Sequence, residues 1–379
     1  MLSQISVPYT NLAQQHAGIK DRLLTAAQRV FDHGRFIFGP EVEEFELSFS
    51  QFCKTKYAVG VGNGTDAIIL ALRAVGVGHG DEVITVANTF VSTVSSIVAV
   101  GAKPVFVDVG HDYNIDPRLI EKAITKRTKA LLPVHLTGRP ADMDSMMSIA
   151  RKHGLKVVED CAQAVGAEYK GRKVGSLGDI GCFSFHPLKT LNACGDGGAI
   201  VTNWPQAFQR VKILRDNGIK TRNECVVWSG NSRLDTIQAA FLLVKLDYFE
   251  RWTEKRIENA KFYQKEFSKL DSIRFPVDQS YEKAVYHTFV IQADQRDRLK
   301  EYLAQKGIGT KIHYPIPVHL QPAAQDLGYK RGDLPVTEKQ SQSILSLPVY
   351  PELGHENLEY IVQMIEEFYK GKDNSPELP

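Results

Sequence analysis

The segment YAVGVGNGTDAIILALRAVG, Tyr57 to Gly76, contains the pattern that decides the fold. A β-rich apolar run ends in a glycine-rich turn, and an amphipathic helical run follows it. Apolar runs and helical runs continue to alternate through DEVITVA (81–87), PVFVDV (104–109) and ALLPVHL (130–136) up to LKVVED (155–160). Two more apolar runs, IGCFSF (180–185) and GGAIVTN (197–203), extend the sheet after a turn-rich stretch. Continuous apolar strands between helices predict an α/β fold with a mainly parallel, seven-stranded sheet that is covered on both faces.

The pattern changes after Ser232. A long helical segment at 233–270 leads out of the first region, and a smaller α/β region follows it. There, AVYHTFVIQA (284–293) is typical of a strand, whereas residues 296–307 and 355–371 have helical periodicity.

The length of 379 residues exceeds the size of a single hydrophobic core. We therefore predict a large domain over residues 1–245 and a smaller C-terminal α/β domain over residues 246–379. The tail from about residue 372 is expected to be disordered.

Composition excludes several classes of function. The 46 basic and 44 acidic side chains nearly balance, which argues against binding to nucleic acid or a membrane surface. No apolar run is long enough to span a membrane, and the first residues do not resemble a signal peptide, so a cytoplasmic protein is expected. The five cysteines include no C-x-x-C pair. We expect reduced thiols and no metal site.

Polar and glycine residues follow several of the predicted strands, at the sheet edge where ligands of such folds bind. After the first strand, Gly64 and Thr65 begin a helix whose free N–H groups suit a phosphate. The alternative is that Thr65 simply caps that helix. A dinucleotide fingerprint would require glycine at position 65, where threonine stands.

Three further strand ends carry residues with two interpretations each. Phe90 is either a core aromatic or a platform for a flat ring. Glu159 and Asp160 either cap the next turn or meet a cation, because a buried carboxylate needs such a partner. Lys189 is either a surface charge or a reactive amine. One ligand satisfies all the functional interpretations: pyridoxal phosphate has a phosphate, a flat ring, a ring nitrogen that must stay protonated, and an aldehyde that condenses with lysine.

Four motifs extend this interpretation beyond single residues. They are EDCAQAVGA (159–167), SFHPLKTLNACGDGGAIVTN (184–203), GNSRLDTIQAAFL (230–242) and HYPIPVHLQPA (313–323). In order and spacing they resemble the motifs of the DegT/StrS-type sugar aminotransferases, which are fold-type I pyridoxal-phosphate enzymes. The resemblance covers most of the chain, from about residue 37 to about residue 353.

The resemblance implies a role for each matching residue. Lys189 would bind the cofactor aldehyde and shuttle the proton, and Asp160 would pair with the ring nitrogen. Gln163 would contact the phenolic oxygen of the ring, on which Phe90 would stack. The family's homodimer would follow as well. The remaining implied contacts are Gly64, Thr65 and Ser184 to the phosphate, Asn231 to the phosphate of the partner subunit, and His313, Tyr314 and His319 near the sugar.

The implied reaction moves an amino group from L-glutamate to a keto group of a nucleotide-linked sugar. The GDGGAI ending (195–200) resembles members that act at carbon 3 of dTDP- or UDP-linked sugars; the alternative is carbon 4. Two positions depart from the family pattern. His186 lies three residues before Lys189; we expect a packed ring, and the alternative is a contact to the substrate. Val165 stands where many members have histidine.

Three other functions compete with this one. Relatives that dehydrate sugars replace the lysine, commonly with histidine, so Lys189 argues against them. A nicotinamide-dependent sugar oxidoreductase would need the missing glycine fingerprint. A non-catalytic regulator of the same fold usually carries a DNA-binding helical segment, which is not found before residue 20.

Overall fold

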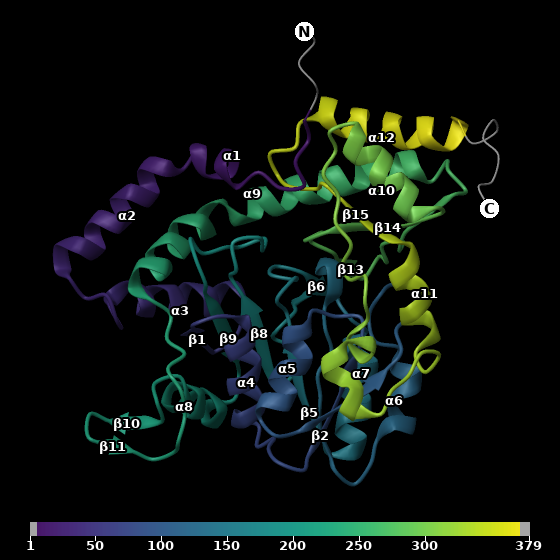
Figure 1. The fold of residues 1–379 in the computed structure, drawn as a ribbon. Coiled ribbons are helices and arrows are strands. Elements are labelled where there is room, and N and C mark those ends of the chain that lie inside the picture. Colours follow the sequence, from purple (N-terminus) through teal and green to yellow (C-terminus); the bar gives the residue numbers. More distant parts are fainter. Residues whose placement is uncertain (1–5, 372–379) are drawn as a thin grey trace.

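The structure, a computed structural model, describes residues 6–371. At its centre lies a seven-stranded sheet of order β1-β9-β8-β5-β4-β2-β3 (Figure 1). Within this sheet β9 runs antiparallel to both of its neighbours, and the other strands share one direction. The strands are β1 (Tyr57–Val61), β2 (Glu82–Val86), β3 (Lys103–Val107), β4 (Thr128–Leu131), β5 (Lys156–Asp160), β8 (Ile180–Ser184) and β9 (Gly198–Thr202). The prediction of a mainly parallel seven-stranded sheet is confirmed.

Helices cover both faces of this sheet because alternate strand residues point to opposite sides. In β5, for example, Val157 belongs to one hydrophobic core and Val158 to the other. Helices α3 (Pro40–Phe52), α6 (Pro117–Ala123) and α7 (Met143–His153) pack into the first core. Helices α4 (Gly64–Ala74), α5 (Val91–Ala99) and α8 (Pro205–Leu214) pack into the second. Strand β5 is therefore buried on both sides, and its carboxyl end is rigidly placed.

A second, smaller antiparallel sheet, of order β12-β14-β15, lies above the first in Figure 1. Its elements and the helices beside it are β12 (Ile273–Arg274), β14 (Phe289–Ala293), β15 (Ile344–Leu347), α10 (Arg296–Gln305) and α12 (His355–Lys370). The strand predicted at 284–293 thus begins only at Phe289. The residues before it hydrogen-bond elsewhere: the N–H groups of Val285 and Thr288 donate to the carbonyls of Gly138 and Thr137.

Helix α9 (Thr236–Phe267) connects the two regions. Its first turns contribute Ala239 and Leu242 to the core of the large sheet, whereas Tyr263 and Phe267 belong to the core of the C-terminal region. The proposed boundary at residue 245 falls inside this helix and stays a prediction. Near the N-terminus Val7 pairs with Ile308, so this segment packs with the C-terminal region. The predicted disordered tail lies outside the described residues.

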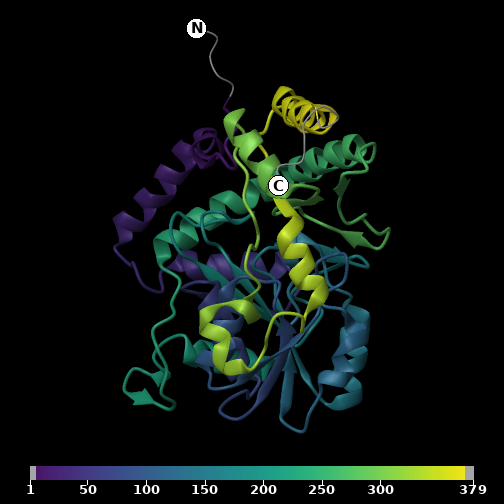
Figure 2. The ribbon, with the colours of Figure 1, turned by 45° about the vertical axis from the view of Figure 1, so that its right-hand side comes forward.

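Smaller elements surround this frame. Helices α1 (Leu12–Ala17) and α2 (Lys20–His33) accompany α9, and the β10–β11 hairpin projects on the same side of the molecule as α2 (Figures 1 and 2). The others are β10 (Ile219–Thr221), β11 (Glu224–Cys225), the sheet of β13 (Glu282–Lys283), β6 (Glu168–Tyr169) and β7 (Arg172–Lys173), the 3-10 helices η1 (Leu136–Gly138), η2 (Val318–Leu320) and η3 (Pro322–Leu327), and α11 (Pro335–Ser343). Within residues 6–371, no helix combines the length and apolar character that crossing a membrane requires.

Candidate active site

A cavity of about 590 Å³ opens where β1, β2, β5 and β8 end. Because these strands point the same way, the residues that follow them meet at one edge of the sheet. All but two of the site residues expected from the sequence line this cavity. Those that do are Gly64, Thr65, Phe90, Asp160, Gln163, Ser184, His186, Lys189, His313 and Tyr314.

One end of the cavity is formed by the amino terminus of α4. The side chain of Asn63 caps this helix, since its Oδ1 accepts from the Asp66 N–H at 2.9 Å. The interpretation of Thr65 as the cap is therefore wrong, and within the described chain its hydroxyl makes no hydrogen bond. A Cβ on Gly64 would lie 2.6 Å from the Cβ of Ser184, so only glycine permits this close approach. The helix amides, Thr65 and Ser184 together form a cradle for an anion.

Asp160 is the last residue of β5, and its buried carboxylate faces the cavity. Its Oδ2 accepts from Thr93 Oγ1 at 2.8 Å, and its Oδ1 accepts from the Ala162 N–H at 3.1 Å. Asp160 thus does cap the following turn, as one interpretation proposed. The two bonds also fix the carboxylate in a position where it attracts a cationic group in the cavity.

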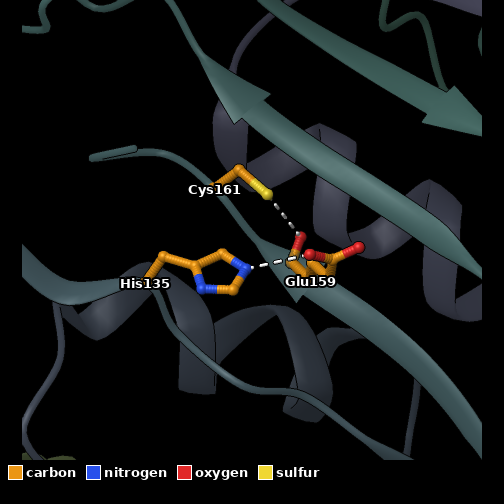
Figure 3. Close-up of side chains that lie close together, drawn as sticks. All are labelled: His135, Glu159 and Cys161. Carbon is orange, nitrogen blue, oxygen red and sulfur yellow. Dashed lines mark hydrogen bonds and ion pairs between the residues drawn. The ribbon is translucent and has the colours of Figure 1, made fainter. Parts of the chain in front are cut away.

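Glu159 points to the opposite side of β5 and has a structural role. Its carboxylate accepts from the N–H groups of residues 175, 177 and 178 and from Nε2 of His135 at 3.0 Å. The Nδ1 of His135 accepts from the Ala141 N–H, so its proton lies on Nε2. Cys161 lies beside this pair, with its Sγ directed to the Glu159 carbonyl (Figure 3). These are residues that metals favour, but protein donors already occupy the carboxylate.

Lys189 follows β8 in a turn that its own N–H closes by donating to the His186 carbonyl at 2.8 Å. Its side chain is half-buried and lines the cavity. Removal of water lowers its pKa to about 8 from an ordinary 10.5, and the charge of Asp160 opposes this shift. The surface-charge interpretation is therefore wrong: this amine is partly neutral near physiological pH, as a nucleophile or general base needs to be.

Aromatic and amide groups line the cavity between these residues. Phe90 is 51% exposed, so the core interpretation of this residue is wrong. Its ring centroid lies 5.8 Å from that of Tyr314. Gln163 holds Tyr314 in place, because its Nε2 donates to the tyrosine Oη at 3.1 Å while its Oε1 accepts from the Thr137 N–H.

The three histidines considered for the substrate site lie in different surroundings. His313 lies in the cavity wall, where burial and the charges of Lys189 and Lys311 lower its pKa to about 4. His186 is exposed at the cavity, so the preferred interpretation as a packed ring is wrong. His319 does not line the cavity; its ring is fully buried and its Nε2 lies 3.1 Å from Glu338 Oε1.

Asn231 also lies outside the cavity of its own chain. It is exposed, between β11 and α9, and its Oδ1 accepts from the Arg233 N–H. Its expected role in the partner subunit stays a prediction. Val165 is fully buried in the core of the large sheet.

The sequence analysis missed a group of polar residues at the cavity. Arg256 of α9 is only 7% exposed, yet its Nε has no hydrogen-bond partner, and burial lowers its pKa to about 10. His287 Nδ1 and Thr288 Oγ1 are likewise buried without a partner. These two polar residues interrupt the apolar run at 284–293, which was a usable signal. Arg256 had none, since it lies in a helix with many other charges.

Comparisons with known proteins point to one family. The model of the DegT/DnrJ/EryC1/StrS aminotransferase family matches residues 18–366. The chain is 44% identical to the "Pleiotropic regulatory protein" of Geobacillus stearothermophilus, over 97% of this chain and 99% of the relative. It is 40% identical to the dTDP-3-amino-3,4,6-trideoxy-alpha-D-glucose transaminase of Streptomyces venezuelae, over 97% and 98%.

Similarity in structure is equally extensive. The crystal structure of S. venezuelae DesV in complex with a ketimine intermediate superposes with a TM-score of 0.94 at 41% identity, covering 96% of this chain and 98% of that one. The family model, the similar sequences and the similar structure therefore agree. This chain belongs to the DegT/DnrJ/EryC1/StrS aminotransferase family.

Proposed function

We propose that this protein transfers an amino group from L-glutamate to the carbon-3 keto group of a dTDP- or UDP-linked hexose, and that it acts as a homodimer. Family membership makes the chain a sugar aminotransferase. The choice of carbon 3 is supported by the GDGGAI ending and by relatives named for 3-amino or 3-oxo sugars with either nucleotide. Action at carbon 4 is the alternative.

The cofactor of this family is pyridoxal 5'-phosphate. The residues at the cavity fit it. The glycine approach to Ser184 and the amides of α4 suit the phosphate, and the exposed face of Phe90 suits a flat ring. The Asp160 carboxylate suits the protonated ring nitrogen, and the Lys189 amine suits the aldehyde. When bound, the cofactor supplies an electrophilic carbon for amines and a ring that withdraws electrons.

Lys189 and Asp160 then have separate tasks. With a pKa of about 8, roughly a tenth of free Lys189 is neutral at pH 7. Its Nζ would take the proton from the alpha carbon of the amino donor and pass it to C4′ of the cofactor. The Asp160 carboxylate would keep the ring nitrogen of the cofactor protonated. The hydrogen bond from Thr93 prevents that carboxylate from turning away. A fixed charge of this kind stabilises a transition state without reorganisation.

The other wall of the cavity suits the substrates. Arg256 is a buried cation without a hydrogen-bonded partner at its Nε, so it favours an anionic group such as a carboxylate or phosphate. His313 stays neutral at pH 7 because of its low pKa, and a neutral imidazole both donates and accepts hydrogen bonds to sugar hydroxyls. Ser346 Oγ lies 2.9 Å from His313 Nδ1 and orients the ring.

The homodimer is supported by exposed apolar side chains on one side of the molecule. Helix α2 and the segment after it expose large apolar residues, and Trp228, beyond the β10–β11 hairpin, is 88% exposed. Both elements lie on the same side in Figures 1 and 2. A second copy would cover such a surface. The exposed side chains of the α2 region are Leu24, Phe31, Phe36 and Ile37.

The observation that carries the proposal is the half-buried Lys189 amine of lowered pKa in one cavity with the buried Asp160. The test is an assay of the purified protein with L-glutamate and a panel of dTDP- and UDP-linked 3-keto and 4-keto hexoses. Product and 2-oxoglutarate are measured by mass spectrometry, with Lys189→Ala as the control. We expect amination of a 3-keto sugar by the wild type alone. Preference for 4-keto sugars would overturn the choice of carbon, and no amination of any sugar would overturn the reaction.

A further inference from the structure

We propose that Lys245, a buried lysine of α9, is a positioning residue that holds the backbone from which Lys189 reaches into the cavity. It acts through Asn192, three residues after Lys189. The inference rests on the proposed function, since it assigns Lys245 to the work of Lys189. Lys245 does not line the cavity, and neither the family motifs nor the cofactor contacts include it.

Lys245 is fully buried, and its ammonium points at a single loop. Its Nζ donates to the Asn192 carbonyl at 2.9 Å and to Asn192 Oδ1 at 2.7 Å, and it lies 3.6 Å from Cys194 Sγ. In the part of the chain that the structure describes, it forms no ion pair with a carboxylate. The three protons of the ammonium are therefore all directed to the stretch that follows Lys189.

Asn192 passes this constraint on to Lys189. Its side chain is almost completely buried, and its Nδ2 donates to the Lys189 carbonyl at 3.1 Å and to Gln15 Oε1 of α1 at 3.2 Å. An ammonium can only donate, so the amide oxygen of Asn192 has to face Lys245. The amide nitrogen then faces the Lys189 carbonyl. Lys245 thus determines which way the amide points, and a reversed amide would place two carbonyl oxygens against each other.

The energetics argue against a role in stability alone. A buried ammonium without a carboxylate is costly, and its pKa is lowered chiefly by desolvation. Methionine has a similar length and would fill the space without that cost. What methionine cannot do is hold Asn192. Two backbone bonds also shape this loop: the Lys189 N–H donates to the His186 carbonyl at 2.8 Å, and the Ala193 N–H donates to the Phe185 carbonyl at 2.7 Å. Asn192, held by Lys245, adds a bond to the carbonyl of Lys189 itself. Displacing a reacting group by about 1 Å is enough to slow catalysis strongly.

The central test compares Lys245→Met with wild type in covalent capture of pyridoxal phosphate by cofactor-free protein. Capture on Lys189 is followed by visible absorbance and, after borohydride reduction, by peptide mass spectrometry. We expect capture to slow at least tenfold in the variant while thermal stability is unchanged or higher. In the loaded enzyme kcat should fall at least tenfold, with KM for glutamate within twofold of wild type.

Two further variants distinguish positioning from general damage. Leu242→Ala removes a fully buried side chain one turn earlier in α9, in the hydrophobic core of the large sheet; it should lower thermal stability and leave capture by the folded protein unchanged. Asn192→Asp keeps an acceptor for Lys245 but loses the donor to the Lys189 carbonyl. It should fold and show the same slow capture, even if Lys245→Met does not fold. A protein with both Lys245→Met and Asn192→Asp should capture the cofactor about as slowly as either single variant.

The outcomes separate the two proposals. If wild type itself captures no cofactor on Lys189, the proposed function fails. If wild type captures normally and both Lys245→Met and Asn192→Asp match it, the positioning role is overturned while the function stands. Slow capture that Leu242→Ala reproduces to the same degree would also overturn it, because lost stability alone would then explain the effect.

Discussion

Replacing Lys189 with methionine is expected to stabilise the cofactor-free protein at neutral pH, although it abolishes activity. Burial lowers the pKa of this lysine to about 8 in the folded chain, against an ordinary 10.5, and Asp160 offsets only part of that effect. Well below pH 8 the lysine is almost fully protonated in both the folded and the unfolded chain. The folded chain then bears the full cost of the desolvated charge, which methionine removes.

The magnitude follows from the two pKa values. They differ by about 2.5 pH units, and at about 1.36 kcal/mol per unit this is about 3 kcal/mol of unfolding free energy. Because the side chain is partly open to the cavity, we expect a gain of roughly 2 to 3 kcal/mol. Between pH 8 and 10.5 the unfolded wild type binds the proton and the folded one does not. Wild-type stability therefore rises with pH relative to the variant, and the gain fades toward pH 10.5.

The assay is urea unfolding of the cofactor-free proteins at equal concentration, at several pH values between about 6 and 10. Lys261→Met is the matched control, since Lys261 is an exposed lysine of α9, and its effect should stay within about 0.5 kcal/mol. A gain that is equal at every pH would mean that methionine merely packs better. No gain at all would mean that Lys189 is well hydrated, which would refute the reasoning from its burial.

Three other experiments test the remaining site residues and the carboxylate behind them. Asp160→Asn keeps the acceptor for Thr93 but loses the negative charge. The cofactor should therefore stay bound while single-turnover transamination slows by at least about 100-fold. Unchanged turnover would mean that Asp160 only caps the following turn. Asn231→Ala and Lys189→Ala should each be inactive alone. When the two variants are mixed and exchange subunits, each mixed dimer has one intact site, so about a quarter of wild-type activity should return. No recovery despite exchange would place Asn231 outside the partner's site. Glu159→Gln should lower the unfolding free energy by about 2 to 4 kcal/mol in urea titrations, because three backbone N–H groups then lose an anionic acceptor; a neutral effect would contradict the structural role of this carboxylate.

Much of the fold could be predicted from local pattern. Strands buried on both faces require continuous apolar runs, and such runs alternate with helices from Tyr57 to Asp160. Parallel strands also place their carboxyl ends together, so Gly64, Asp160 and Ser184 could be assigned to one edge from their positions in the sequence. The long helix around residues 233–270 was likewise visible from its uninterrupted helical periodicity.

Single residues whose function depends on distant neighbours could not be assigned in this way. From the sequence, aromatic rings such as those of Phe90 and His186 are expected to pack in a core. The arrangement of the surrounding loops leaves both of them exposed at the cavity. His319 lies within a motif, yet Glu338 and the aromatic residues around it bury its ring away from the cavity. Burial and exposure result from contacts between segments far apart in sequence, which local pattern does not contain.

The sequence by itself determined the α/β frame and, through its motifs, the expectation of a lysine, a carboxylate and a glycine turn at one sheet edge. Only the tertiary structure brought Arg256 of α9 and His287 before β14 into the same cavity. It also linked Lys245 to Asn192 across 53 positions of the chain. The physical reason is that strand periodicity is a local property of the backbone, whereas the pKa of a lysine and the partner of a buried amide depend on which side chains the finished packing leaves beside them.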